Sequence, residues 1–163
     1  MNFRIFINFF LLLLLCSCTA LKKNKNNNPN AVVPKLEKYG KYGNPKSYNV
    51  FDVEYNVLGS HINFTEEGIA SWYGEKFHGK LTSIREVYDM YQLTAAHRSL
   101  PIPCYVKVTN LENNKSVIVR INDRGPFSKN RIIDLSYAAA KELDFIEKGT
   151  AKVHIETIDA EKY

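Results

Sequence analysis

A strand leads into a stiff turn in the stretch Val119-Arg120-Ile121-Asn122-Asp123-Arg124-Gly125-Pro126-Phe127. Apolar and polar residues alternate in its first half, which is typical of a strand with one buried face. Pro126 has no N–H to donate to a neighbouring strand, so we expect the strand to end in the turn at Asp123-Arg124-Gly125-Pro126.

Short strands dominate the rest of the chain. Ser116–Ile121 alternates and is expected to pair as a hairpin with Tyr105–Thr109 across the turn Glu112-Asn113-Asn114. Ser136 is an expected N-cap before a helix that begins at Tyr137. Further strands are expected at Ser47–Val57 (one or two strands), Gly68–Tyr73 and Ala151–Glu156. This pattern predicts a mostly-β fold with one or two short helices, arranged as a closed or nearly closed β-barrel.

The N-terminus has the pattern of a secretion signal. Arg4 precedes the apolar run Ile5–Leu15, which is too short to span a membrane as a helix but suits a signal peptide. The run ends in Leu15-Cys16-Ser17-Cys18, which resembles the lipobox of bacterial lipoproteins. Cys18 is the expected lipidation site, because the small Ser17 precedes it, and an ordinary cleaved signal is the alternative.

The resemblance to lipoproteins predicts the location of the protein. Acyl chains on Cys18 would hold it at a membrane, since each buried methylene contributes about 0.8 kcal/mol. Thr19 follows instead of Asp, which favours the outer membrane by the enterobacterial sorting rule, with the domain facing the periplasm. The chain then divides into a signal peptide (1–17), a lipidated N-terminus with a flexible tether (18–46), lead-in strands (47–66), a barrel domain (67–158) and a tail (159–163).

Composition limits the classes of partner and cofactor. A formal net charge of +5 suits any polyanion, but without a dense basic helix we expect no nucleic acid partner. Cys104 lies in an apolar run and is expected to be a small buried residue without a disulfide partner. The remaining histidines, at positions 61, 78 and 154, lack ligand-like spacing, so neither a metal site nor a cofactor is expected.

Several motifs along the chain together resemble one family. They are Gly68-Ile69-Ala70-Ser71-Trp72-Tyr73-Gly74, Leu93-Thr94-Ala95-Ala96-His97-Arg98-Ser99-Leu100-Pro101, Val119–Phe127 and Ile133-Asp134-Leu135-Ser136. In this order and spacing they resemble the rare lipoprotein A family from about Ser47 to Thr157. The resemblance implies a six-stranded double-psi β-barrel. It also implies a lytic transglycosylase that cleaves peptidoglycan glycan strands between N-acetylmuramic acid and N-acetylglucosamine.

The expected chemistry centres on Asp123. Cleavage requires a proton for the bridging oxygen and stabilisation of positive charge on the sugar. In a lytic transglycosylase the 6-hydroxyl of muramic acid then attacks and leaves a 1,6-anhydro end, so one carboxyl can serve as acid and then as base. Asp123 matches the catalytic aspartate of the family; the alternative from the residues alone is that it caps a turn.

His97 and Glu86 match further family positions. His97 is expected to donate to the sugar or to tune Asp123, and its alternative is a structural histidine. Glu86 is expected as a lesser catalytic residue, and its alternative is an exposed loop charge. Ile84 and Arg85 occupy the family's small and glycine positions before it. If that glycine needs a positive φ, Arg85 strains the loop by about 1 kcal/mol or changes its course.

The remaining candidates would bind substrate. Trp72 and Tyr73 offer flat faces for sugar rings, although Trp72 could equally be a core residue. Arg124 could meet acyl or lactyl oxygens. Asp134 is expected to order the turn before the helix and is a weak site candidate.

Three rival functions stay open. The barrel could bind glycan and organise the wall without cutting it, as related barrels of expansin type do, and the altered Ile84-Arg85 loop favours this rival. The protein could instead recruit cell-division or wall-synthesis proteins through its tether. Finally, Asp123 and Glu86 could act as a carboxylate pair around a water and hydrolyse the strand.

Overall fold

The computed structural model describes residues 31–163, and the predicted hairpin lies at its centre. Strand β5 (Cys104–Asn110) pairs antiparallel with β6 (Ser116–Asp123), and Val106 lies opposite Val119. Strand β6 ends at Asp123, as the following turn predicts. Gly125 has a φ of 131°, a conformation open to glycine, so the chain can turn sharply away from the strand at this point.

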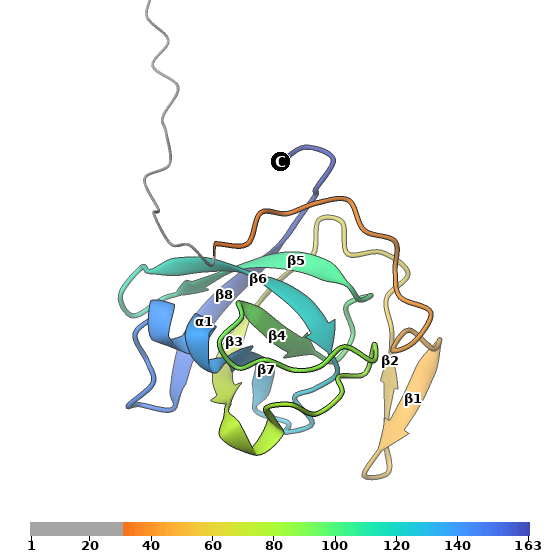
Figure 1. Cartoon of the computed structure of the whole chain (residues 1–163), viewed down its shortest axis with the longest axis horizontal. Coiled ribbons are helices and arrows are strands. Elements are labelled where there is room, and N and C mark those ends of the chain that lie inside the picture. Colours follow the sequence, from red (N-terminus) through yellow and green to blue (C-terminus); the bar gives the residue numbers. More distant parts are fainter. Residues whose placement is uncertain (1–30) are drawn as a thin grey trace, which may run out of the picture.

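Six strands close into a barrel in the order β3-β7-β4-β6-β5-β8, seen in Figure 1. The pairs β3–β7 and β4–β6 are parallel and the other pairs are antiparallel. The remaining barrel strands are β3 (Thr65–Tyr73), β4 (Thr94–His97), β7 (Arg131–Ser136) and β8 (Thr150–Ile158). The predicted mostly-β fold with a closed six-stranded barrel is confirmed.

The barrel interior is filled by branched apolar side chains. Alternate residues of each strand point inward, because successive side chains of a strand face opposite sides of the sheet. The fully buried members include Val106, Val108, Val119, Ile121, Ile133, Leu135, Val153 and Ile155. Each such side chain contributes about 1.5–3 kcal/mol on burial. Cys104 is also buried, as expected, and burial raises the pKa of its thiol to about 12.

The short helix α1 (Tyr137–Glu142) follows β7 directly. Ser136 caps it as predicted, since its hydroxyl accepts a hydrogen bond from the Ala139 N–H at 3.2 Å. A single-turn 3-10 helix, η1 (Glu75–Phe77), follows β3 and has no counterpart in the sequence prediction.

Two barrel strands differ from the sequence prediction. Asp134 does not lie in a turn before the helix but inside β7. Both faces of this strand pack against protein, so its residues show no simple alternation of apolar and polar types. Strand β4 is short and rich in alanine, which is a weak signal for a strand.

A separate hairpin precedes the barrel. Strands β1 (Ser47–Val50) and β2 (Val53–Asn56) pair antiparallel, within the segment where the sequence predicts one or two strands. The hydroxyl of Tyr48 donates to the Arg98 carbonyl oxygen at 2.7 Å and holds the hairpin beside the barrel. Figure 1 shows the turn of this hairpin and η1 at the same edge of the molecule.

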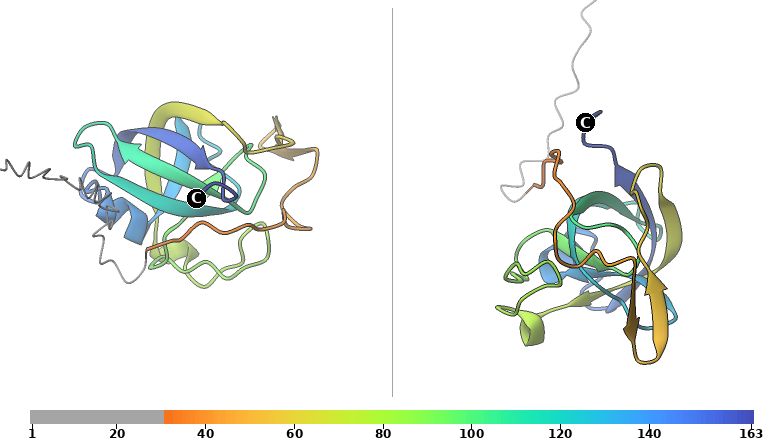
Figure 2. Two further views of the ribbon diagram at one scale, coloured as in Figure 1. Left: turned by 90° about the horizontal axis from the view of Figure 1, so that it is seen from above. Right: turned by 90° about the vertical axis from the view of Figure 1, so that its right-hand side faces the viewer.

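Residues 31–46 differ from the predicted tether. Figure 2 shows this segment running along the barrel. The Gly40 N–H donates to the Ile102 carbonyl oxygen at 2.8 Å, and the Ile102 N–H donates to Asn44 Oδ1 at 2.8 Å. Glu37 forms an ion pair with Arg120 at 2.9 Å. These hydrogen bonds and the ion pair hold the segment on the barrel although it lacks apolar periodicity. Residues 31–46 therefore belong to the folded unit.

The predicted signal peptide and Cys18 lie outside the described residues. Within residues 31–163, no helix is long and apolar enough to cross a membrane.

Candidate active site

A cleft of about 740 Å³ opens where several barrel strands end. Ala96 of β4 lies in the cleft, and because its side chain is only a methyl group it leaves room between the neighbouring strands. The other lining residues come from β3, η1, the turn after β6, β7 and the β1–β2 turn, and they are Phe51, Trp72, Tyr73, Gly74, Glu75, Lys76, Phe77, Asp123, Arg124, Gly125, Pro126, Phe127, Ser128, Arg131 and Asp134.

Asp123 lies in this cleft at the end of β6. Its Oδ1 accepts two backbone hydrogen bonds, from the N–H groups of Ser83 and Arg124, both at 2.8 Å. Within residues 31–163, no side-chain or backbone donor is hydrogen-bonded to the other oxygen, Oδ2. The carboxyl group is therefore fixed through one oxygen while the other is available to a substrate.

Asp134, a weak site candidate from the sequence, is a second carboxyl group in the cleft. Ala96 pairs in register with Asp123 on one side and with Asp134 on the other. Two strand spacings separate the aspartates, so their Cα atoms lie roughly 10 Å apart. Burial raises the pKa of Asp134, although a 2.6 Å hydrogen bond from the Ser71 hydroxyl and the charge of Arg131 oppose the rise.

Trp72 and Tyr73 both line the cleft, as their predicted role requires. Trp72 also packs against the core and meets Tyr137 edge to face at 5.7 Å, so it serves both as core and as cleft wall. A Cβ on Gly74 would lie 2.7 Å from the Trp72 ring, which explains why glycine follows these aromatic residues. Tyr73 stacks on Tyr88 at 4.2 Å, which fixes its ring orientation.

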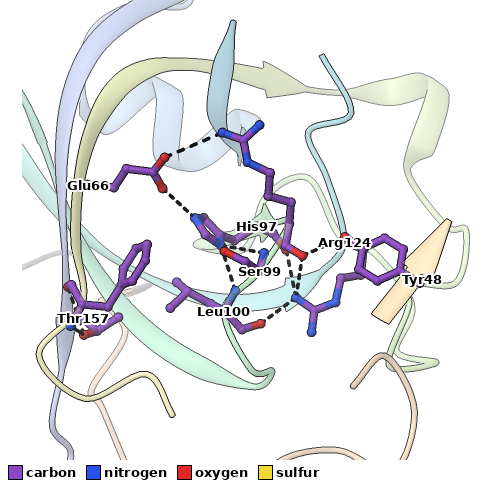
Figure 3. Close-up of polar contacts among 9 residues, drawn as sticks. Tyr48, Glu66, His97, Ser99, Leu100, Arg124 and Thr157 are labelled. Carbon is purple, nitrogen blue, oxygen red and sulfur yellow. Dashed lines mark hydrogen bonds and ion pairs between the residues drawn. The ribbon is translucent and has the colours of Figure 1, made fainter. Parts of the chain in front are cut away.

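Arg124 lines the cleft, but its guanidinium is engaged by the protein. Figure 3 shows it directed at backbone oxygens of the segment after β4. The acceptors are Gly43 O (2.7 Å), His97 O (3.0 Å), Leu100 O (2.6 Å) and Asn44 Oδ1 (3.0 Å). These contacts use most of the five donors of a guanidinium. Arg124 therefore ties the turn after β6 to two loops, and a direct contact with the substrate stays a prediction.

His97 differs from its prediction, because it contacts neither Asp123 nor the cleft. Its ring is fully buried. Nδ1 accepts the N–H groups of Ser99 and Leu100 at 3.2 and 3.0 Å, while Nε2 lies 3.3 Å from the carboxylate of Glu66 (Figure 3). Burial lowers the pKa of His97 despite this carboxylate. The alternative of a structural histidine agrees with these contacts: His97 shapes the segment whose carbonyl groups hold Arg124.

Glu86 also lies apart from the cleft. Its carboxylate accepts from Arg120 at 2.7 and 3.0 Å and from Asn122 at 3.0 Å. Burial would raise the pKa of Glu86, but these hydrogen bonds and the charge of Arg120 outweigh it and lower the pKa. Glu86 therefore stays ionised and paired, which suits a structural role better than proton donation.

The loop before Glu86 keeps the backbone that a glycine would favour. Arg85 has a φ of 72°, in the left-handed region, so the strained of the two expected outcomes is the one observed. The loop closes through a hydrogen bond from the Arg85 N–H to the Thr82 carbonyl oxygen at 2.9 Å. Since Ser83 of this loop donates to Asp123, the substitution at Arg85 leaves the support of Asp123 in place.

Within the described part of the chain, no group of three or more His, Cys, Asp or Glu side chains is arranged to hold a metal ion. A second cavity, of about 450 Å³, lies between residues 35–39 and the chain end at 158–161. Neither Asp123 nor Asp134 lines it, so the cleft is the better candidate for the catalytic centre.

Comparisons with known proteins agree on one family. A family model described as lytic transglycolase matches residues 65–155. The chain is 56% identical over 129 residues to the endolytic peptidoglycan transglycosylase RlpA of Vibrio cholerae serotype O1, covering 79% of this chain and 49% of the relative. It is 55% identical over 131 residues to the RlpA of Pseudomonas aeruginosa, covering 80% of this chain and 38% of the relative. The chain thus spans about half the length or less of these curated relatives.

A solved structure supports the fold independently. The Streptomyces papain inhibitor matches with a TM-score of 0.51 at 19% identity, over 61% of this chain and 99% of the inhibitor. At this identity the likeness shows the barrel fold alone.

Proposed function

Because the chain belongs to the rare lipoprotein A family of lytic transglycolases, with its double-psi β-barrel, we propose that it is an endolytic peptidoglycan transglycosylase. It would cleave glycan strands between N-acetylmuramic acid and N-acetylglucosamine and leave 1,6-anhydro ends. One observation carries the proposal: Asp123 and Asp134 lie on either side of Ala96 in a cleft of about 740 Å³. An elongated substrate could enter this cleft.

Asp123 would move the protons. Its carboxyl donates a proton to the bridging oxygen, the bond from the muramic acid C1 to that oxygen breaks, and N-acetylglucosamine leaves with a free 4-hydroxyl. The 6-hydroxyl oxygen of muramic acid then bonds to C1 and returns its proton to Asp123. C6 stands on the same face of the ring as the leaving oxygen. One carboxyl on that face can therefore serve both steps, and no water is consumed.

Asp134 would act by charge. Positive charge develops on the sugar ring in the transition state. The Asp134 side chain is only 17% exposed, so its carboxylate is incompletely solvated and its pKa is raised. A poorly solvated negative charge interacts strongly with a positive charge nearby. Ser71 fixes the side chain through its 2.6 Å hydrogen bond, so little reorganisation is needed.

Product analysis tests the proposal. Purified protein is incubated with peptide-free glycan strands, and the products are identified by mass spectrometry. Anhydro-ended fragments that disappear with Asp123→Asn support the proposal. Reducing ends would indicate hydrolysis instead, and uncut strands that sediment with the protein would indicate the non-catalytic, expansin-type wall binder.

The altered loop no longer favours that binder over the enzyme. The loop would favour the binder only if Ile84 and Arg85 displaced the floor of the cleft. Arg85 accepts the left-handed conformation, and Ser83 still donates to Asp123 at 2.8 Å. The support of the catalytic carboxyl therefore needs no glycine in this loop.

The location of the enzyme is part of the proposal. Lipid on Cys18 would anchor it to the outer membrane, facing the periplasm, with residues 19–30 between the lipid and the folded unit. Metabolic labelling with palmitate tests the anchor, because label should enter the intact protein and be absent from Cys18→Ser. Label in the outer-membrane fraction would support the sorting, and label confined to the inner membrane would contradict it. Recruitment of cell-division or wall-synthesis proteins stays a proposal, tested by cross-linking in cells.

A further inference from the structure

The turn of the β1–β2 hairpin carries an exposed aromatic ring into the cleft. Phe51 is 84% exposed, more than the other large apolar side chains in residues 31–163. It nevertheless lines the same cleft as Asp123. A single exposed apolar residue needs no explanation by itself. Phe51 differs because its hairpin places it at the opening of a candidate active site.

The turn holds Phe51 in an unfavourable backbone conformation. Val50 pairs with Val53, which leaves Phe51 and Asp52 as a two-residue loop. Their φ values are 51° and 61°, both in the left-handed region. Asn-Gly is the usual sequence for such loops, and a bulky residue with a positive φ costs about 1 kcal/mol. Folding alone therefore gives no reason for a phenylalanine at this position.

The base of the hairpin is joined to the turn that follows Asp123. Tyr48 and Tyr55 stack at 5.5 Å, and Phe127 packs against both at 6.3 and 5.5 Å. The Arg124 guanidinium lies over the Tyr48 ring at 5.9 Å. The hairpin is thus held in a fixed position relative to Asp123 rather than projecting freely.

A second aromatic ring lines the cleft from another element. Phe77 of η1 is 47% exposed and meets Tyr73 edge to face at 5.8 Å. The cleft therefore has aromatic side chains from the hairpin, from η1 and from β3. Pyranose rings present apolar C–H faces that pack against aromatic rings, whereas their hydroxyl groups point sideways to water or polar side chains.

We propose that Phe51 forms a saccharide-stacking subsite, at which a sugar of the glycan strand distant from the cleaved bond packs on the ring. The proposal rests on the glycan-cleaving function and assigns the hairpin a part in it. The expected ligand is an N-acetylhexosamine unit of a strand long enough to reach from Asp123 to the hairpin. Sugars at the bond that breaks would lie beside Asp123 and Asp134 instead.

Steady-state kinetics on glycan strands of defined length test the subsite. Phe51→Ala should raise KM about fivefold on long strands and change kcat less than twofold, because an aromatic contact contributes about 0.5–1.5 kcal/mol. Phe51→Tyr should restore KM, since it keeps a flat ring. Tyr163→Ala removes another exposed ring, 64% exposed at the chain end, and is the matched control that should leave KM unchanged.

Binding separates this proposal from the catalytic one. In the Asp123→Asn background, Phe51→Ala should weaken co-sedimentation with glycan strands about fivefold. If strands are never cut but Phe51→Ala still weakens binding, the subsite survives and the transglycosylase proposal fails. If Phe51→Ala changes neither KM nor binding while its circular dichroism matches the parent, the subsite is overturned.

Discussion

The barrel carries two groups of carboxyl side chains, and their surroundings differ. In the cleft, Asp123 is held by backbone N–H groups, and Asp134 is held by a serine hydroxyl and by a longer ion pair with Arg131 at 3.4 Å. Away from the cleft, Glu37 of the N-terminal segment and Glu86 of a loop share the guanidinium of Arg120 in β6, which Glu37 contacts at 2.9 Å and Glu86 at 2.7 Å. Burial raises the pKa of Asp134, whereas the hydrogen bonds and charge of Arg120 lower the pKa of Glu37 and that of Glu86. The difference teaches which acidic residues can perform chemistry.

The largest expected effect separates Asp123 from Glu86. Asp123→Asn should lower the rate of glycan cleavage at least about 100-fold, since general acid–base catalysis contributes that much or more. Glu86→Gln should lower it less than about threefold, because the amide can still accept from Asn122. Release of anhydro-ended fragments measures both rates. A comparable loss in the two variants would return Glu86 to the catalytic role that the family resemblance implies.

A smaller effect is expected at Asp134. Asp134→Asn should lower kcat about tenfold through lost charge stabilisation.

The raised pKa of Asp134 also predicts a stability change, because the folded state then binds a proton more tightly than the unfolded state. The stabilisation that Asp134 contributes to the folded state is therefore present below pH 3.8 and is lost as pH rises through the folded pKa. Asp134→Asn should thus unfold at higher temperature than the parent at pH 7, with a smaller gain at pH 4.

The cluster around Arg120 should respond in stability rather than in activity. Arg120→Ala leaves two carboxylates without their cation and should lower the free energy of unfolding by about 2 kcal/mol. The pKa of Glu37 and that of Glu86 are both lowered, so their stabilisation is present above pH 4.5 and is lost as pH falls through the folded values. Urea unfolding at pH 7 and pH 4 measures this. If Arg120→Ala loses as much free energy of unfolding between pH 7 and pH 4 as the parent protein does, the pairing is contradicted.

The smallest effect concerns the loop between the two groups. Arg85→Gly should raise the free energy of unfolding by about 0.5–1 kcal/mol, because glycine accepts the φ of 72° without strain. The rate of cleavage should stay within twofold, since Ser83 keeps its bond to Asp123. Thermal unfolding compares Arg85→Gly with Arg85→Ala. If Arg85→Ala is also more stable than the parent protein, the backbone conformation is not the cause of the gain.

Local patterns predicted the elements that have one polar and one buried face. The β5–β6 hairpin, the Ser136 cap and the lead-in strands all follow from alternation or turn chemistry within a few residues. Strand β7 was not predicted because both of its faces are covered, and β4 was not predicted because it is short and rich in alanine. Residues 31–46 looked like a tether, since their partners Ile102 and Arg120 are far away in sequence.

The same reasoning explains the site. Asp123, Trp72 and Tyr73 belong to local motifs, and the structure places all of them in the cleft. The environments of His97, Glu86 and Arg124 depend on partners from other strands, so their buried or paired states are invisible in a motif. Asp134 was only a weak candidate from the sequence, although its apolar neighbours indicate a desolvated carboxyl group.

The sequence by itself determined the strand-and-turn pattern, the family and the position of Asp123, because each is encoded in neighbouring residues. Only the tertiary structure decided which carboxyl groups share Arg120 and which line the cleft. Barrel closure places strands side by side that are distant in the chain, as Ala96 lies between Asp123 and Asp134. Charge, burial and pKa depend on those neighbours through space, which no local pattern records.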